Sequence, residues 1–260
     1  MKKTLVLLLV AIPVILYGIW FAFTKESLQS LIEWAFAGGD GIVEIKGLEK
    51  GIFYDFSISR ATLKTSRSEL ISFENIRARI NPLYLLIMRM DISFKGDACG
   101  GNFSGCLHLR KKRAMGEIEI KRAVIDEVPF LKLAGIKGAG TVSGKYLLAD
   151  GNGHADFFTQ DAVFEPAFFS GIKMPLNLFS SIKGSLDIKG DIINIVSVSL
   201  EGKDVYARLK GSVRNAFIDI KMELMPGPPL AENPLFLAEF ERNKVSPGYY
   251  VIAVREQLSL

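Results

Sequence analysis

The segment SIKGSLDIKGDIINIVSVSLEGKDVYARLKGSVRNAFIDIKMELMP, residues 181–226, decides the fold of this chain. Apolar and polar side chains alternate along most of it, as where Leu186 and Ile188 flank Asp187. A period of two residues is typical of a β-strand that has one buried face and one wet face. Short polar breaks separate the alternating pieces, so the segment predicts a series of short strands joined by tight turns.

One irregularity interrupts this alternation. Ile193 and Ile195 have the opposite parity to Val196, Val198 and Leu200. Successive side chains of a strand point to opposite faces, so such a slip requires one extra residue in the strand. We therefore predict a β-bulge near Ile195.

The same alternation begins at about residue 42 and continues to about residue 121. The apolar positions that carry it include Val43, Ile45, Tyr54, Phe56, Ile58, Ile76, Ala78, Ile80, Met90, Ile92 and Phe94. Tight turns join only antiparallel neighbours, so we predict one long antiparallel β-meander. Residues 123–136 break the pattern and predict a short helix around Phe130 to Ala134. Residues 159–178 are less regular and predict a loop, a small helix or a joint between two parts.

An apolar face of this length needs a cover, and the sequence contains few helices that could supply one. The apolar faces must therefore pack against each other, close into a barrel, or fold over into a groove that something apolar fills. We predict a mainly β fold whose antiparallel meander folds into a groove, with a β-sandwich or a barrel as the alternatives. By parity, the residues expected to line the groove are Ile118, Ile120, Leu186, Ile188, Ile218 and Ile220.

The N-terminal segment predicts where this β domain lies. The twenty residues Thr4–Phe23 contain no charge and follow Lys2 and Lys3. Twenty helical residues span about 30 Å, the thickness of the hydrocarbon core of a bilayer, and the lysines favour a cytoplasmic N-terminus. We expect residues 1–24 to be a single-pass membrane anchor and residues 25–260 to form a β-rich domain on the far side, which in a bacterium is the periplasm.

A cleaved signal peptide is the alternative to an anchor. Signal peptides have an apolar region of about 7 to 15 residues and a small-x-small cleavage site. Here the apolar run is longer, and Trp20 stands two places before Ala22, where a small residue is needed. An uncleaved anchor fits these residues better.

A short amphipathic helix is predicted directly after the anchor segment. Its apolar stripe at helical spacing consists of Leu28, Leu31, Ile32, Ala35 and Phe36, and Gly38-Gly39 marks its end. The stripe lacks the flanking basic residues that are typical of a helix lying on a bilayer. We therefore expect this helix to cap the β domain.

Composition and motifs exclude several classes of function. The net charge of +4 is mixed along the chain, so no nucleic-acid partner is predicted. The sequence has no phosphate-binding loop, no supported Ser-His-Asp motif and no metal-ligand spacing, so we expect a non-enzymatic protein without catalytic residues, metal sites or cofactors. Cys106 and His108 lie two apart on one strand, which is a poor geometry for a nucleophile and its base.

The strongest basic run of the chain is Arg110-Lys111-Lys112-Arg113. Strand-like sequence brackets the run on both sides, so it predicts a solvated hairpin end. Contact with anionic lipid head groups is the alternative interpretation.

Two cysteines, Cys99 and Cys106, flank the turn signal Gly100-Gly101-Asn102. A short hairpin there could bring the two Cα atoms within the roughly 7 Å that a disulfide requires. The periplasm permits such bonds. The alternatives are a disulfide and two reduced, half-buried thiols.

The chain resembles a known group of proteins over nearly its whole length. The segments GLEKGIFYDFSISRATL, IRARINPLYLL and FKGDACGGNFSG follow one N-terminal anchor segment. This pattern is similar to that of the AsmA-like periplasmic β-groove proteins, and within them to the type II secretion system protein GspN family. The late segment from Ile182 to Val213 resembles the C-terminal repeat of the same group.

The resemblance implies a non-enzymatic periplasmic component of the type II protein secretion system, anchored in the bacterial inner membrane and partnered with other secretion components. The group also includes long relatives whose hydrophobic β-grooves are thought to pass lipids between membranes. The alternative is therefore a lipid-binding or lipid-transfer groove for phospholipid or another acyl-chain lipid. This chain is much shorter than those bridges, which argues against its crossing a periplasm alone.

Overall fold

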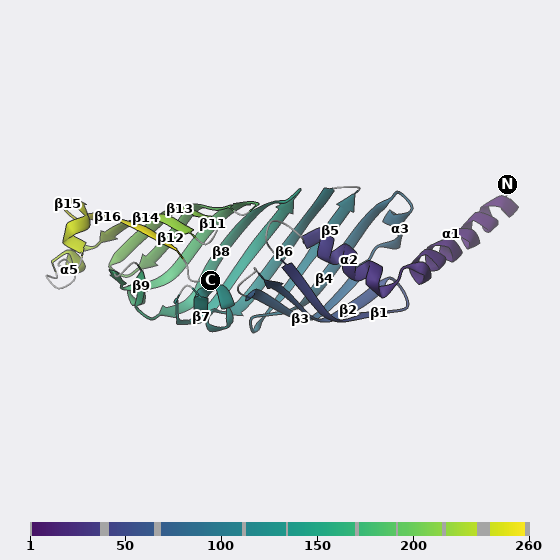
Figure 1. The fold of residues 1–260 in the computed structure, drawn as a ribbon, viewed down its shortest axis with the longest axis horizontal. Helices are drawn as coiled ribbons and strands as arrows, with labels where there is room; N and C mark the ends of the chain where they lie inside the picture. Colours follow the sequence, from purple (N-terminus) through teal and green to yellow (C-terminus); the bar gives the residue numbers. More distant parts are fainter. Residues whose placement is uncertain are drawn as a thin grey trace.

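A long β-sheet preceded by two helices makes up most of the protein (Figure 1). The computed structural model describes residues 2–36, 42–64, 69–110, 113–133, 135–169, 172–190, 192–214, 217–232 and 240–257. The helices and helical turns are α1 (Lys2–Ala22), α2 (Lys25–Phe36), α3 (Pro82–Leu85), η1 (Ile125–Glu127), α4 (Pro129–Leu133), η2 (Leu176–Leu178), α5 (Pro228–Ala231) and η3 (Glu241–Asn243). The strands are β1 (Ile42–Lys50), β2 (Asp55–Lys64), β3 (Glu69–Ile80), β4 (Arg89–Ala98), β5 (Gly101–Arg110), β6 (Arg113–Val124), β7 (Gly138–Ala149), β8 (Asn152–Phe164), β9 (Ala167–Phe169), β10 (Ile172–Met174), β11 (Phe179–Lys189), β12 (Ile192–Gly202), β13 (Val205–Arg214), β14 (Phe217–Pro226), β15 (Lys244–Ser246) and β16 (Tyr249–Gln257).

The main sheet contains 14 antiparallel strands. Each strand pairs with its neighbours in the sequence, except that β8 pairs with β11 and β14 pairs with β16. Strands β9 and β10 form a separate two-stranded hairpin. Among the described strands, β1 and β15 are the outermost and do not pair with each other, so the sheet is not closed into a barrel. The predicted antiparallel meander is confirmed, and the barrel and the two-sheet sandwich are wrong.

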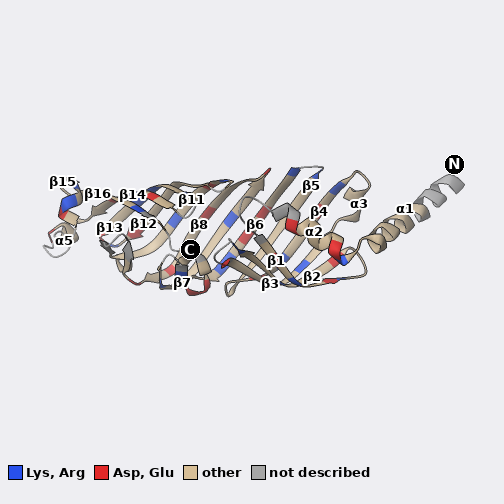
Figure 2. Ribbon diagram, viewed as in Figure 1, with Lys and Arg blue, Asp and Glu red and all other residues tan. Residues whose placement is uncertain are grey.

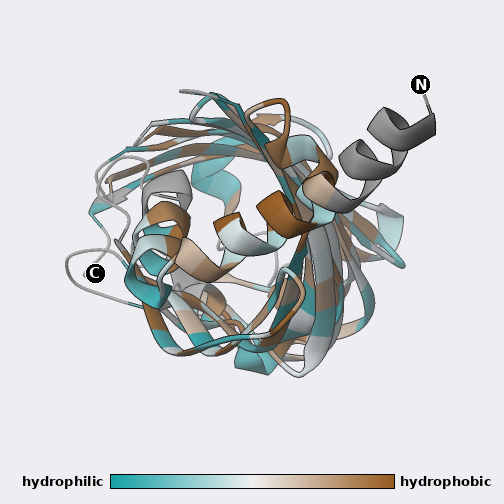
Figure 3. Cartoon of the chain, turned by 90° about the vertical axis from the view of Figure 1, so that its right-hand side faces the viewer, coloured by the Kyte–Doolittle hydropathy of each residue, from teal (hydrophilic) through white to brown (hydrophobic). Residues whose placement is uncertain are grey.

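The sheet curls about its long axis. A view along this axis shows strands surrounding α2 (Figure 3). In α2, the side chain of Leu28 is fully buried and that of Ile32 is buried, both packed with side chains of the first strands. The predicted capping helix is therefore confirmed, while Gly38 and Gly39 lie outside the described residues.

Bulges in several strands accompany this curvature. The register between β12 and β13 shifts between Ile195 and Val198, which confirms the bulge predicted near Ile195. Three other strands contain a residue with positive φ where their register shifts: Asn75 (50°), Arg122 (54°) and Asp161 (50°). A bulge bends its strand and increases the local twist, so these positions curl the sheet.

Two separate hydrophobic clusters bury the ends of the sheet. The N-terminal cluster takes side chains from α1, α2 and strands β1 to β5. The C-terminal cluster takes side chains from η1, η2, the β9–β10 hairpin and strands from β8 to β16. The two ends of this long sheet therefore have separate cores.

The two irregular segments of the sequence both fold onto the sheet. The helix predicted around Phe130 to Ala134 corresponds to α4 (Pro129–Leu133), although Ala134 itself lies outside the described residues. In the second segment, β8 continues to Phe164 and is followed by the β9–β10 hairpin and η2. Ala167, Met174 and Leu176 are buried there, so this segment belongs to the C-terminal cluster and is not a joint between two parts.

The end of α1 packs against the β1–β2 hairpin. The indole Nε1 of Trp20 donates a hydrogen bond to the carbonyl oxygen of Gly51 at 3.0 Å, and the Tyr54 hydroxyl donates to the carbonyl of Leu16. The ammonium group of Lys50 donates to the carbonyls of Trp20 and Phe23 and so caps the helix C-terminus. Leu16 and Trp20 are buried in the N-terminal cluster. Within the described residues, no helix combines the length and the apolar character that crossing a membrane requires.

Candidate functional site

The six residues predicted to line a groove all lie on one face of the sheet. One row of directly opposed residues crosses seven strands in the order Ile118, Tyr146, Ala155, Leu186, Ile195, Gly211 and Ile220. Ile120, Ile188 and Ile218 lie two positions away along the same strands and therefore share this face. We call it the apolar face.

The middle of the apolar face is only half covered. The half-buried side chains there are those of Ile118, Ile120, Tyr146, Leu186, Ile188, Ile193, Ile195 and Ile220. Ile218, by contrast, is buried. A hollow of about 990 Å³ adjoins strands β6 to β12, but most of the residues that border it, among them Lys145, Asp156 and Ser185, belong to the opposite face of the sheet. Because these side chains are only half-buried, solvent reaches an apolar strip that runs from the edge of the N-terminal cluster, at Ile118 and Ile120, toward the C-terminal cluster.

Glycines make room for aromatic rings on the apolar face, both within this strip and beside it. Phe157 lies directly opposite Gly184, and a Cβ atom at Gly184 would be 2.3 Å from Cζ of the Phe157 ring. Phe94 lies opposite Gly105 in the same way, with a corresponding distance of 2.6 Å. Each ring therefore lies over a neighbouring glycine, close to the sheet.

Replacing Gly184 with alanine is expected to displace the Phe157 ring away from the sheet. The added methyl overpacks the site, and we expect a loss of about 1–3 kcal/mol in the free energy of unfolding. The displaced ring should also narrow the space above the apolar face and reduce the amount of lipid recovered with the protein. Chemical denaturation and mass spectrometry of extracted lipid measure the two effects.

A second substitution tests this explanation. Phe157→Leu added to Gly184→Ala removes the colliding ring and should restore part of the lost stability. Equal stability of the single and double variants would show that the destabilisation by Gly184→Ala does not come from a clash with the Phe157 ring.

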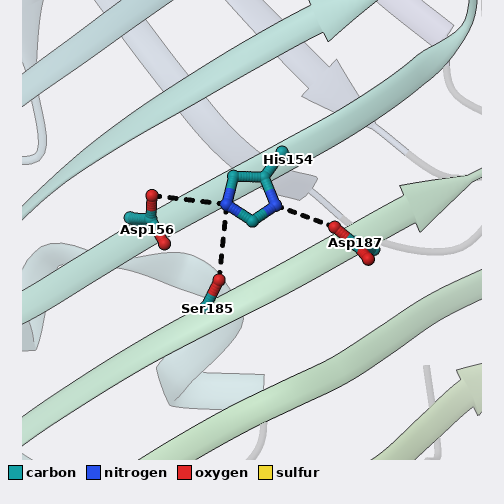
Figure 4. A network of polar contacts seen from close by, with 4 residues as sticks. All are labelled: His154, Asp156, Ser185 and Asp187. Carbon is teal, nitrogen blue, oxygen red and sulfur yellow. Dashed lines mark hydrogen bonds and ion pairs between the residues drawn. The ribbon is translucent and has the colours of Figure 1, made fainter.

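The opposite face carries a polar network around His154 (Figure 4). His154 on β8 lies opposite Asp187 on β11, and Asp156 lies opposite Ser185. The imidazole Nδ1 is 2.7 Å from Oδ1 of Asp187, and Nε2 is 3.3 Å from Oδ2 of Asp156 and 3.4 Å from Oγ of Ser185. The sequence did not reveal this network, because 33 residues separate His154 from Asp187.

Serine, histidine and aspartate side chains also form catalytic triads, but the charges here oppose that role. Both ring nitrogens of His154 face a carboxylate, an arrangement that favours the protonated ring, in which both nitrogens donate. The hydrogen bond to Asp187, together with the negative charge of Asp156, raises the pKa of His154. A general base needs a free nitrogen lone pair, and the imidazolium has none. The network is therefore suited to pairing charges across two strands.

Replacing Asp187 with asparagine is expected to lower the pKa of His154 toward the ordinary value of about 6.5. Because the folded pKa is raised, the stabilisation by this network is full below the unfolded pKa of about 6.5 and is lost as the pH rises through the folded pKa. NMR titration of the His154 ring in both proteins measures the shift. Asp97→Asn on β4 is the matched control, and an unchanged His154 titration in Asp187→Asn would contradict the assignment.

The structure leaves Cys99 and Cys106 unbonded and half-buried, so the predicted disulfide alternative is wrong. Cys99 lies in the turn after β4, whereas Cys106 lies within β5 opposite Ser93. At about 3.4 Å per residue, the five residues from Gly101 to Cys106 place the two thiols too far apart for a bond. Burial is the main cause that raises the pKa of the Cys99 thiol, which disfavours the reactive thiolate.

The structure also shows the surroundings of His108 and of the possible metal ligands. His108 directs Nδ1 to Oδ1 of Asp91 at 3.0 Å, across the β4–β5 pair. Across the part of the chain that is described, no cluster of His, Cys, Asp and Glu side chains could hold a metal ion. The absence of catalytic and cofactor sites stays a prediction.

No protein-family model, curated protein or solved structure matches this chain. The resemblance to the GspN family therefore rests on the segments quoted above. The function is inferred from the geometry of the apolar face.

Proposed function

We propose that this protein binds the acyl chains of phospholipids or related lipids in a groove formed by the apolar face. The observation that carries this function is the half-buried apolar strip that crosses seven strands from Ile118 to Ile220. Seven strands at about 4.8 Å spacing span about 29 Å. The hydrocarbon core of a bilayer, which holds two chains end to end, is about 30 Å thick. The strip is therefore long enough for one extended acyl chain.

Simple energetics favour exchangeable binding. A fully buried CH₂ group contributes about 0.8 kcal/mol, so about 12 half-buried methylenes contribute about 5 kcal/mol. Association costs several kcal/mol of that gain. A groove of this kind holds a lipid without retaining it permanently, which suits a protein that takes up and releases lipid.

The proposal includes a location. We infer that α1 is the anchor of a single-pass bacterial inner-membrane protein whose β domain lies in the periplasm. Thr4–Phe23 carries no charge, and hydrogen bonds from Trp20, Lys50 and Tyr54 join the end of α1 directly to the sheet. Such a connection would hold the groove at the membrane surface, where lipids are supplied.

Native mass spectrometry of the full-length protein tests lipid binding. The full chain is needed because Leu16 and Trp20 belong to the N-terminal cluster, so removal of residues 1–24 would damage the core. The expected result, when phospholipid is added in excess after detergent exchange, is a complex of the chain with phospholipid. A mass equal to that of the chain alone would contradict the lipid-binding function.

A second candidate function is assembly within the type II secretion machinery. Strand β15 covers only Tyr249 and Tyr250 of β16, so among the described residues no strand pairs with the outer edge from Val251 to Arg255. An open strand edge can add a strand from a partner protein. Photo-crosslinking from Ala253 in membranes tests this function, and recovery of no secretion component would count against it.

A further inference from the structure

We propose that the edge of the sheet beside α1 contacts an anionic phospholipid bilayer directly and inserts apolar side chains into it. This contact edge consists of the β1–β2 loop (51–54), the α3 loop (81–88) and the strand-end residues Arg89, Arg110 and Arg113. The inference goes beyond lipid binding in a groove and does not depend on what occupies the apolar face.

The two loops of the contact edge expose large apolar side chains. The exposed fractions are 67% for Ile52, 68% for Phe53, 65% for Leu83, 57% for Ile87 and 86% for Met88. A single exposed apolar residue is ordinary, but a cluster at loop tips marks a contact with another apolar phase.

The α3 loop is built to present these side chains. Asn81 is the N-cap of α3, and its side-chain oxygen accepts a hydrogen bond from the backbone N–H of Leu83 at 3.2 Å. Pro82 occupies the first turn, where its fixed φ favours the helix. The loop is therefore ordered: Leu85 packs against the N-terminal cluster, whereas Leu83, Ile87 and Met88 are exposed.

The two loops adjoin each other and α1. The backbone N–H of Ile80, at the start of the α3 loop, donates to the carbonyl oxygen of Tyr54 at 2.7 Å. The Phe53 ring lies 6.4 Å from the ring of Tyr17 on α1. Figure 1 shows α3 at the same end of the sheet as α1. The exposed loop residues thus continue the surface of the proposed anchor.

A row of arginines borders the apolar loops. Arg89 directly follows the α3 loop and lies opposite Arg110, which lies opposite Arg113 on β6. Figure 2 shows Lys and Arg colouring along this edge near β4 and β5. Arg113 lies 3.9 Å from Asp150, whereas Arg89 and Arg110 form no ion pair within the described residues.

This arginine row identifies the partner. Like charges directly opposed across strands destabilise a sheet, so the row favours an anionic partner that neutralises it. Apolar side chains that enter the interface, flanked by basic groups at head-group level, are the combination that binds anionic bilayers. Arg110 and Arg113, from the basic run of the sequence, therefore lie beside the exposed apolar residues of the α3 loop.

Site-specific labelling of the full-length protein tests the contact edge. In a Cys99→Ser/Cys106→Ser background, Met88→Cys is labelled with an environment-sensitive fluorophore and reconstituted into vesicles of phosphatidylcholine with phosphatidylglycerol. We expect a blue-shifted emission and protection from an aqueous quencher. Val163→Cys is the matched control. Val163 is 67% exposed near the C-terminal end of β8, away from the contact edge, and should stay accessible to the quencher. Arg110→Glu/Arg113→Glu should reduce protection at position 88 severalfold.

Three outcomes would overturn the proposal. The first is equal quenching at positions 88 and 163 in these vesicles. The second is protection at position 88 that does not fall when phosphatidylglycerol is left out of the vesicles or when Arg110 and Arg113 are replaced by glutamate. This result would show that the partner does not have to be anionic. The third is concentration-dependent protection in detergent without lipid, which would indicate a second copy of the chain. Mass spectrometry of bound lipid on the same samples reports separately on the groove.

Discussion

Replacing Leu186 with aspartate is expected to lower the affinity for lipid roughly 10- to 100-fold, which corresponds to about 1.4–2.8 kcal/mol of binding free energy. Leu186 lies at the centre of the row that crosses the apolar face, between Ala155 and Ile195. A carboxylate there stays hydrated in the empty protein, because the position is half-buried. An acyl chain would have to strip that water away, and burying an unpaired charge costs several kcal/mol. Quantitative lipid extraction from the purified full-length variant measures the loss.

The matched control places the same substitution on the opposite face. Leu147 is 41% exposed on β7 and lies opposite His154, so its side chain belongs to the polar face. Leu147→Asp should bind as much lipid as the parent protein, including any lipid retained around α1. An equal loss of lipid in both variants would mean that the apolar face is not the binding site.

Replacing Leu224 with alanine is expected to cost about 2–5 kcal/mol in the free energy of unfolding. Leu224 is 1% exposed in the C-terminal cluster, between Ala207 and Tyr250. The loss is a large share of the roughly 5–15 kcal/mol by which ordinary domains are stable. Guanidinium denaturation measures the total loss, and Leu147→Ala on the exposed face should change stability by less than about 0.5 kcal/mol.

Hydrogen exchange should show where the Leu224→Ala protein opens. Nearly all strand pairs join neighbours in the sequence, and the two hydrophobic clusters are separate. In such quasi-linear architectures a local defect mainly affects neighbouring units. Faster exchange should therefore appear in β12 to β16 and leave β2 to β5 protected. A uniform increase along the chain would mean that the sheet unfolds as a single cooperative unit.

Much of the fold was predictable because it depends on local patterns. Alternation with period two identified the strands, and the parity slip located the bulge near Ile195. The helical stripe of Leu28 and Ile32 predicted a cap, and both side chains are buried. Of the two alternatives for Cys99 and Cys106, the structure shows the half-buried thiols: a disulfide required the two residues to face each other across a hairpin, whereas the turn closes at Cys99 and Gly100.

The sequence by itself determined which residues can share a face, since side-chain direction along a strand follows from the backbone. The uncharged segment Thr4–Phe23 and the arginine–lysine run at residues 110–113 are also recognisable from the sequence alone. Only the tertiary structure decided the register between strands, and register sets which side chains become neighbours. Register places His154 beside Asp187 and aligns Arg89 with Arg110. Ile218 is buried and Ile220 is half-buried although both lie on the same face, because burial depends on packing between distant parts of the chain.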